Sequence, residues 1–374
     1  MGISGTIFLA GGGTGGHLYP GIAVAEALRE VAPDLKPIFL CTEREIDRTI
    51  LTPTGFQFIP QPIVPPLRTV GGLLKFWTSW RETKDLVRRT FREHKPLAAL
   101  GLGGYAAGVA VQYLARRDRP TAILNPDVIP GKANQYLLKY ARVMCCQFES
   151  TSAHVSNSQK SRLVITGCPI RTDLLSLPPR EQAIARLGLT NGLMTLVVTG
   201  ASQGALTVND AVLGAAGSLK LQGWQILHLS GKEHAESVRA AYRELNIPAA
   251  VVDFTPAMAD VWAVADLTVS RSGASTCAEL TACGVPSILM PYPYHKDQQQ
   301  KLNAQVLVSA GAAVLLDDLK DKKRNSERLL PILQSLLYDA PQRTKMAQAA
   351  RSLARPEAAA NVARVITSML SAGR

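Results

Sequence analysis

Residues 11–17 read GGGTGGH and follow a short apolar run at 7–10, where a loop could hold a phosphate. Glycines let the backbone approach a phosphate closely, and a helix N-terminus presents free N–H groups to an anion. Residues 11–16 also match the dinucleotide-binding pattern. This pattern also requires an acidic residue that contacts the ribose. Glu43, the first acidic residue after the next apolar run, lies further from the glycine loop than that residue usually does. The segment therefore predicts an anion-binding turn without defining its ligand.

His17 closes this first glycine loop and is its one ionisable side chain. An imidazole can accept a proton at neutral pH, so a histidine at the mouth of a ligand-binding loop is a candidate general base. The alternative is a histidine that only caps or packs the loop.

Two later segments repeat this design. Residues 199–205 read TGASQGA, and Ser202 with the backbone N–H groups could hold a diphosphate. Residues 270–279 read SRSGASTCAE, and the carboxylate of Glu279 could accept hydrogen bonds from both hydroxyls of a ribose. A structural turn and a solvent-exposed glutamate are the alternatives.

A fourth segment, residues 291–300, reads PYPYHKDQQQ and is followed by Asn303. Side-chain amides offer donors and acceptors together, as sugar hydroxyls do, so the segment is a candidate sugar site. A polar linker is the competing interpretation.

Short apolar runs alternate with amphipathic stretches and so predict βαβ units with parallel sheets. Strands are expected at 7–10, 37–41, 97–102, 122–124, 193–200, 224–230, 249–254, 267–270, 287–291 and 313–316. Helices are expected at 21–31, 73–93, 133–140, from about 206, and at 361–370. Each half opens with a strand, a glycine loop and a helix, which favours an α/β fold of two doubly wound, Rossmann-like domains.

Gly167 and Pro169 punctuate the chain between the two halves. We predict a first domain over 1–166 and a second over 167–355. A final helical segment at 356–374 follows, and the sequence leaves open whether it packs back on the first domain.

The composition of the 374-residue chain agrees with a globular protein, since 47 % of its residues are apolar and 19 % are charged. A net charge of +12 favours anionic partners. The cysteines lack metal-site spacing and are expected to be reduced and mostly buried. The N-terminus does not resemble a signal peptide, and no apolar run is long enough to span a membrane, so any membrane contact is expected to be peripheral.

Residues 73–81, LLKFWTSWR, combine aromatic and basic side chains, and more basic residues follow at Lys84, Arg88, Arg89 and Arg92. Interfacial helices have this composition. The alternative is an amphipathic helix that packs its aromatic residues in the core.

In this order and at these spacings, the four segments and the Gly103-Gly104-Tyr105 turn resemble the MurG family over nearly the whole chain. That family transfers N-acetylglucosamine from UDP-N-acetylglucosamine to undecaprenyl-diphosphate-linked N-acetylmuramyl pentapeptide, which converts lipid I to lipid II in peptidoglycan synthesis. The resemblance implies the glycosyltransferase-B fold, with two Rossmann-like domains facing a cleft.

The resemblance also assigns roles to individual residues. It places Glu279 on the ribose, the pair Gln299 and Gln300 on the sugar, and Thr255 near the uracil. The remaining substrate-binding positions that it implies are Thr14, Gly15, Gly16, Asp127, Arg171, Ser202, Ala274, Ser275 and Thr276.

The chain departs from the family pattern at four places. Asn125-Pro126-Asp127 replaces a stretch that usually ends His-Glu-Gln-Asn, so Asp127 stands where a sugar-contacting asparagine is usual. Cys168 replaces an asparagine and Ala201 a glycine, and the polar loop has one extra residue near Pro293.

The resemblance implies direct displacement with inversion at the anomeric carbon. His17 is the first candidate for the general base and Asp127 the second. No tightly bound metal and no nucleic-acid partner are expected. The protein is expected to act at the cytoplasmic face of the inner membrane, on an anionic lipid surface. Alternatives are a transferase for another lipid acceptor, a UDP-N-acetylglucosamine 2-epimerase, or a non-catalytic nucleotide-sugar-binding protein.

Overall fold

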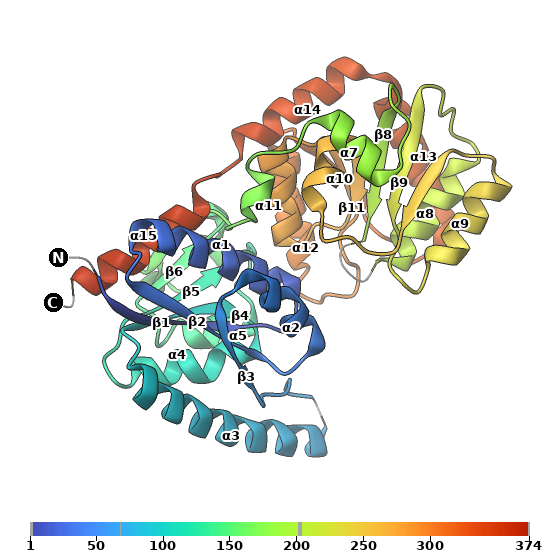
Figure 1. The fold of residues 1–374 in the computed structure, drawn as a ribbon. Helices are drawn as coiled ribbons and strands as arrows, with labels where there is room; N and C mark the ends of the chain where they lie inside the picture. The colour runs from blue at the N-terminus through green and yellow to red at the C-terminus, as the bar shows by residue number, and fades with distance from the viewer. Residues whose placement is uncertain (1–2, 68, 201–203, 373–374) are drawn as a thin grey trace. The chain divides into compact units, whose positions relative to one another are not determined.

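The computed structural model describes residues 3–67, 69–200 and 204–372. They form two compact units (Figure 1). The first contains the described residues up to Arg171 and again those from Arg355 onward, and the second is Thr172–Ala354. We predicted a division after residue 166. In the structure Gly167, at φ 84°, stays with the first unit because its backbone lies against Arg355 and Ala358.

The first unit contains a parallel sheet in the order β3-β2-β1-β4-β5-β6-β7. Its strands are β1 (Gly5–Gly11), β2 (Leu35–Thr42), β3 (Gln57–Gln61), β4 (Ala98–Gly103), β5 (Thr121–Asn125), β6 (Val143–Cys146) and β7 (Leu163–Ile165). Its helices are α1 (Gly15–Val31), α2 (Glu45–Leu51), α3 (Val70–His94), α4 (Gly108–Ala115), α5 (Lys132–Leu137), α6 (Asn157–Lys160) and α15 (Ala358–Ser371).

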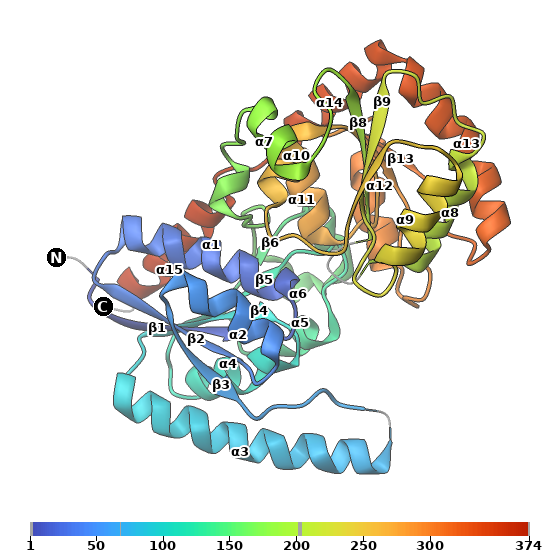
Figure 2. The same cartoon turned by 45° about the vertical axis from the view of Figure 1, so that its right-hand side comes forward.

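Both faces of this first sheet are covered by helices, as its sequence pattern requires. Ile7 and Leu9 of β1 pack in a core with α1 and α15, whereas Phe8 and Ala10 pack in another with α3 and α4. Successive side chains of a strand point to opposite faces, so a strand that is apolar at every position must be covered twice (Figure 2).

Helix α15 settles where the end of the chain packs. Val362, Ile366 and Leu370 are buried in the same core as Val24 and Leu28 of α1. The last helix therefore belongs to the first unit, although the whole second unit precedes it in sequence.

The second unit contains a parallel sheet in the order β10-β9-β8-β11-β12-β13. Its strands are β8 (Met194–Thr199), β9 (Trp224–Leu229), β10 (Ala249–Val252), β11 (Ala265–Ser270), β12 (Ser287–Leu289) and β13 (Ala313–Leu315). Its helices are α7 (Arg180–Leu187), α8 (Leu206–Ala216), α9 (Ala235–Glu244), α10 (Met258–Val264), α11 (Ala274–Cys283), α12 (Gln299–Ser309), α13 (Lys322–Tyr338) and α14 (Ala340–Ser352).

The strand order of each sheet gathers the predicted loops at one edge. In the first unit Gly11 at the end of β1 pairs with Gly103 at the end of β4. In the second, Ser270 of β11 pairs with Thr199 on one side and Leu289 on the other. Both β1–β4 and β8–β11 are points where the chain reverses its direction across the sheet, and ligands of doubly wound sheets bind there.

All six cysteine side chains are buried, as predicted. Within the described part of the chain, every helix is too short or too polar to cross a membrane.

Candidate active site

The first glycine loop is held from below by Asp47, a fully buried carboxylate on α2. Asp47 accepts hydrogen bonds from the Gly13 N–H at 2.8 Å and from the N–H and hydroxyl of Thr42 at 2.8 and 2.7 Å. A Cβ at Gly12 would lie 2.2 Å from the Asp47 carboxylate, so only glycine fits there. Arg44 donates to the Gly13 carbonyl at 2.6 Å. Because Asp47 takes the Gly13 N–H, that group is not offered to a ligand.

The N–H groups offered at this edge are those of the first turn of α1. The helix begins at Gly15, six positions before the start we predicted at residue 21, and it contains Pro20. Pro20 has no N–H to donate, so the helix lacks one backbone hydrogen bond at this interior position. Thr14 is the exposed N-cap, in an extended conformation, and the first turn has no acidic residue. Gly15 and Gly16 therefore present backbone donors to an anion.

His17 lies in this first turn with its ring against Gly103 and Gly104. A Cβ at either glycine would approach the imidazole to 3.0 Å. The ring Nδ1 lies 3.1 Å from the Gly12 carbonyl oxygen and 3.3 Å from the Thr14 hydroxyl. A carbonyl can only accept, so Nδ1 carries the proton and Nε2 keeps its lone pair. Nε2 has no hydrogen-bond partner among the residues that the structure describes.

The loop after β5 carries the unusual Asn125-Pro126-Asp127 stretch. Asn125 is buried, and its side-chain amide donates to the Asp127 carbonyl at 2.7 Å. Asn134 donates to the Leu124 carbonyl at 2.7 Å and holds the other side of the turn. The Asp127 side chain is half-buried. In this chain Asn125 therefore shapes the loop.

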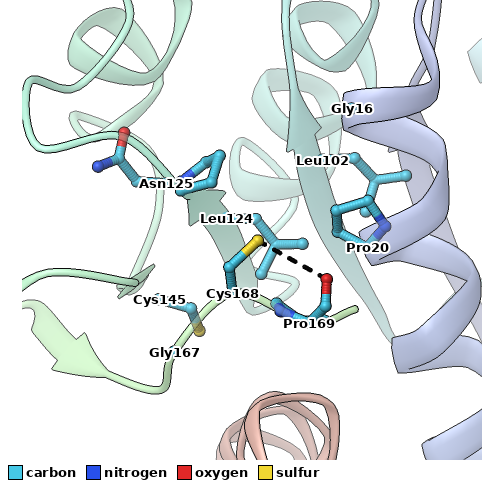
Figure 3. Close-up of a pocket in the computed structure, with 10 residues that line it drawn as sticks. Gly16, Pro20, Leu102, Leu124, Asn125, Cys145, Gly167, Cys168 and Pro169 are labelled. Atoms are coloured by element: carbon cyan, nitrogen blue, oxygen red, sulfur yellow. Dashed lines mark hydrogen bonds between the residues drawn. The ribbon is translucent and has the colours of Figure 1, made fainter. Parts of the chain in front are cut away.

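Two departures from the family pattern lie together in a small cavity of the first unit (Figure 3). Asn125 and Pro126 line it with Cys168, next to Gly16 of α1. Its volume is about 10 Å³, which is room for one water at most. The cavity is thus a packing feature beside the glycine loop, and no sugar would fit in it.

Arg171 joins the same unit through Tyr19, a residue that sequence reasoning did not single out. The Arg171 guanidinium lies 4.8 Å from the centre of the Tyr19 ring. The ring in turn packs on Gly15, where a Cβ would approach it to 2.9 Å. Tyr19 thus links two predicted binding residues.

In the second unit the glycine loop after β8 is only partly described. Ser202 lies outside the described residues. Gly204, at φ 73°, approaches the Ser230 carbonyl so closely that a Cβ would lie 2.2 Å from its oxygen. Asn209 of α8 donates to that carbonyl at 2.9 Å. Only glycine therefore fits at position 204, two residues before α8 begins.

The hydroxyl-rich segment after β11 forms the N-terminus of α11, as predicted. Ala274 is the first helical residue, and Ser275 and Thr276 are half-buried in a first turn without acidic residues. Glu279 lies further along the same helix and is half-buried. Its Oε2 accepts a 2.8 Å hydrogen bond from the indole of Trp262 on α10.

The polar segment after β12 is tied to the segment after β11. The Ser272 hydroxyl donates to the Gln300 carbonyl at 2.8 Å. The Gln300 side-chain oxygen accepts from the Tyr292 N–H at 2.9 Å, which directs its amide nitrogen to other acceptors. Gln299 and Gln300 are the first two residues of α12. The β11–β12 pairing thus brings both segments together.

Thr255, the residue that the resemblance associates with uracil, lies between β10 and α10. It is half-buried, and its hydroxyl accepts a hydrogen bond from the Ala257 N–H at 3.1 Å. In this structure the threonine side chain therefore stabilises the turn that leads into α10.

A buried ion pair that sequence reasoning missed lies beneath these segments. Arg271 donates to the Asp318 carboxylate at 2.9 Å and to the Thr207 hydroxyl of α8 at 2.7 Å. Burial lowers the pKa of Arg271, and its bond to Asp318 opposes that shift. Burial acts to raise the pKa of Asp318, but hydrogen bonds led by that of Thr207 outweigh it, and the pKa is lowered. The pair ties α8 to the end of β11.

Asp47, Tyr19, Trp262 and Arg271 escaped the sequence analysis because each acts through a residue distant in sequence. Asp47 lies 34 positions from Gly13, and only the β1–β2 pairing brings them together. Arg271 offered one signal, since an arginine at the end of an apolar run is costly to bury without a partner.

The chain matches two family models, the glycosyltransferase family 28 N-terminal domain over residues 7–145 and the C-terminal domain over residues 195–362. A curated relative from Thermodesulfovibrio yellowstonii is 33 % identical over 374 residues and covers 97 % of this chain and 98 % of its own. Its name is UDP-N-acetylglucosamine–N-acetylmuramyl-(pentapeptide) pyrophosphoryl-undecaprenol N-acetylglucosamine transferase. The chain belongs to the MurG family of glycosyltransferases. A relative of the same name from Halothermothrix orenii is 31 % identical and covers 94 % of this chain and 95 % of its own.

Solved structures agree with the predicted glycosyltransferase-B fold. Acinetobacter baumannii MurG matches with a TM-score of 0.74 at 24 % identity, over 97 % of this chain and 99 % of its own. A UDP-GlcNAc 2-epimerase from Neisseria meningitidis matches with a TM-score of 0.70 at 12 % identity, over 98 % of this chain and 100 % of its own. At these identities the likeness is one of fold, shared by transferases and epimerases.

Proposed function

We propose that this MurG-family protein transfers N-acetylglucosamine from UDP-N-acetylglucosamine to undecaprenyl-diphosphate-linked N-acetylmuramyl pentapeptide, with inversion at the anomeric carbon. The near full-length identity to transferases of that name supports the substrates. The observation that carries the chemistry is His17, whose Nδ1–H is held by the Gly12 carbonyl while Nε2 keeps its lone pair.

In the proposed reaction His17 Nε2 takes the proton of the acceptor hydroxyl as that oxygen attacks the anomeric carbon. The bond from that carbon to UDP breaks, and the leaving diphosphate carries away the electron pair. A positioned base contributes about 10²–10⁴-fold to the rate. Asp127 is the second candidate for the base, and the half-buried position of its side chain is compatible with that role.

The donor is proposed to bind the second unit. Three segments at one edge of its sheet supply the groups: the N-terminus of α8, that of α11 with Ala274, Ser275 and Thr276, and that of α12 with Gln299 and Gln300. Ser202, which precedes α8 in the sequence, is proposed to bind the diphosphate through its hydroxyl. None of α8, α11 and α12 has an acidic residue in its described first turn, but the Asp297 carboxylate just before α12 lies 3.4 Å from the Gln299 N–H. The N-termini of α8 and α11 are therefore the ones that we propose for the negative charge on the UDP leaving group. Glu279 takes the ribose, and Thr255 lies beside the uracil.

The acceptor diphosphate is proposed to bind the first turn of α1, where Thr14, Gly15 and Gly16 offer donors. Arg171 adds positive charge close to this turn, since its guanidinium lies over Tyr19. We propose that the reaction requires no tightly bound metal, because helix N-termini and Arg171 stabilise the negative charge of the diphosphate groups that a metal ion would otherwise stabilise.

We further propose that the protein works at the cytoplasmic face of the inner membrane and docks there through α3. Val70, Leu74 and Trp77 are 79 %, 65 % and 58 % exposed, whereas Phe76 and Trp80 pack against the core. The helix therefore uses some aromatic residues in the core and others on its surface. A basic groove between α3 and α4 lies beyond this patch, lined by Arg81, Lys84, Arg88, Arg92 and Arg117. Apolar and basic side chains in this combination suit an anionic lipid surface.

A UDP-release assay tests the proposed function. UDP should appear from UDP-N-acetylglucosamine only when a short-chain lipid I analogue is present. Release without any acceptor would favour a 2-epimerase or a hydrolytic side reaction. Donor binding with no release under either condition would favour a different acceptor or a non-catalytic protein.

A further inference from the structure

Trp262 and Glu279 form a hydrogen-bonded pair between two helices of the second unit. Trp262 is 3 % exposed, and its indole Nε1 donates to Oε2 of Glu279 at 2.8 Å. A buried indole N–H requires an acceptor, and here the acceptor is the half-buried carboxylate that we propose for the ribose. The bond joins α10 to α11, so the buried Trp262 of one helix holds the Glu279 side chain of the other.

A glutamate carboxylate rotates broadly about its last side-chain bond and loses this freedom when it binds a ligand. A charge-assisted bond from a rigid indole removes part of that freedom before the ligand arrives. The indole bonds one of the two carboxylate oxygens, so it constrains the plane in which both oxygens would accept from the hydroxyls of a ribose.

We infer that Trp262 is a positioning residue, which orients Glu279 for the two ribose hydroxyls and so sets a preference for ribonucleotide over 2′-deoxyribonucleotide donors. This inference rests on the proposed donor site. Trp262 is buried like Ala259 and Val261 of the same helix, so phenylalanine would keep an apolar ring at this position and remove the N–H. The distinctive contribution of tryptophan is its N–H.

The test compares the affinities of UDP and 2′-deoxy-UDP by calorimetry for the full chain and three variants. Trp262→Phe removes the indole donor, and Glu279→Gln removes the charge of the acceptor. Trp224→Phe is the matched control, since Trp224 is a buried tryptophan of the same unit, 4 % exposed, with Arg343 over its ring.

The unmodified protein should prefer UDP by about tenfold or more, the value of a hydroxyl bonded to a charged group. Trp262→Phe should reduce this preference by about threefold or more, Glu279→Gln should nearly abolish it, and Trp224→Phe should leave it unchanged. An unchanged preference in Trp262→Phe would overturn the inference, even if both affinities fell together. If the unmodified protein bound neither nucleotide, the proposed donor site itself would fail.

A second measurement avoids reliance on the folding of Trp262→Phe. Single variants of the other three tryptophans, Trp77, Trp80 and Trp224, identify their indole N–H resonances. The resonance that remains in the spectrum of the unmodified protein is that of Trp262. UDP should shift this resonance more than 2′-deoxy-UDP does. Equal shifts would contradict a link between the indole and the ribose.

Discussion

The imidazole Nδ1 of His17 lies 3.1 Å from the carbonyl oxygen of Gly12, and this contact fixes the tautomer of the ring. Its consequence is that Nε2 is available as a base without any change of hydrogen bonding. The ring also rests against Gly103 and Gly104, where a larger residue would displace it.

Replacing His17 with alanine should lower kcat by about 10²–10⁴-fold, because the acceptor hydroxyl loses its base. The dissociation constant for UDP-N-acetylglucosamine should change little, since the proposed donor groups lie in the second unit. Steady-state kinetics and calorimetry measure the two quantities. His94→Ala, a half-buried histidine on α3, is the control. Near-normal turnover of the His17 variant would remove it from the role and direct attention to Asp127.

Asp47→Asn should lower the free energy of unfolding by about 1.5–3 kcal/mol. The Asp47 carboxylate accepts hydrogen bonds from the N–H groups of Gly13 and Thr42. The amide nitrogen of an asparagine is itself a donor and could not replace one of these acceptors. Urea denaturation measures the loss, and the exposed Asp34→Asn is the control. The variant should also raise the KM for the acceptor analogue, because the loop before α1 loses its support. A variant as stable as the parent would show that Asp47 does not hold the loop.

The exposed surface of α3 predicts a membrane-binding defect for the double variant Leu74→Ser, Trp77→Ser. Flotation with anionic liposomes should fall by severalfold, while activity on a soluble acceptor analogue is retained. Tyr338→Ser, an exposed aromatic residue on α13 that is 54 % accessible, should float normally. Charge reversal at Arg88, Arg89 and Arg92 should weaken binding to anionic vesicles specifically. Unchanged flotation in both α3 variants would exclude this surface.

The buried His228 should make the stability of the second unit sensitive to acid. Its Nε2–H donates to Asn209 Oδ1 at 3.0 Å, its Nδ1 accepts from the Tyr242 hydroxyl at 2.9 Å, and burial lowers its pKa to about 3. The unfolded chain binds a proton at this histidine near pH 6.5, whereas the folded chain does not. The stability contributed by the neutral His228 is therefore fully present above pH 6.5 and is lost progressively as the pH falls towards 3. Between pH 7.5 and 5.5 the loss attributable to this histidine should be about 1.4 kcal/mol.

Urea denaturation of the protein and of His228→Gln at these two pH values measures that contribution. Glutamine can keep one donor and one acceptor, so the variant should fold and its stability should change less with pH. An identical pH dependence in both proteins would contradict the assignment.

The two-sheet fold could be predicted because short continuous apolar runs such as 7–10 and 313–316, set between amphipathic stretches, are typical of buried parallel strands. The strands β3, β6 and β7 were missed, since polar or short segments such as Gln57–Gln61 give no such pattern. The glycine loops, His17 and Glu279 were recognisable from local sequence. Their supports were not, because Asp47, Trp262 and Arg271 reach their partners only through strand order and helix packing, and Tyr19 meets Arg171 only in the folded chain. The start of α1 was predicted too late because Pro20 is tolerated within its second turn.

The most direct test of the central claim is analysis of the product formed from UDP-N-acetylglucosamine and a short-chain lipid I analogue. Mass spectrometry and proton NMR should show one added N-acetylglucosamine, joined to the 4-hydroxyl of the muramyl sugar in the β configuration, with one UDP released per sugar transferred. An α-linked product, a sugar attached elsewhere, or an epimerised donor with the acceptor unchanged would contradict the account.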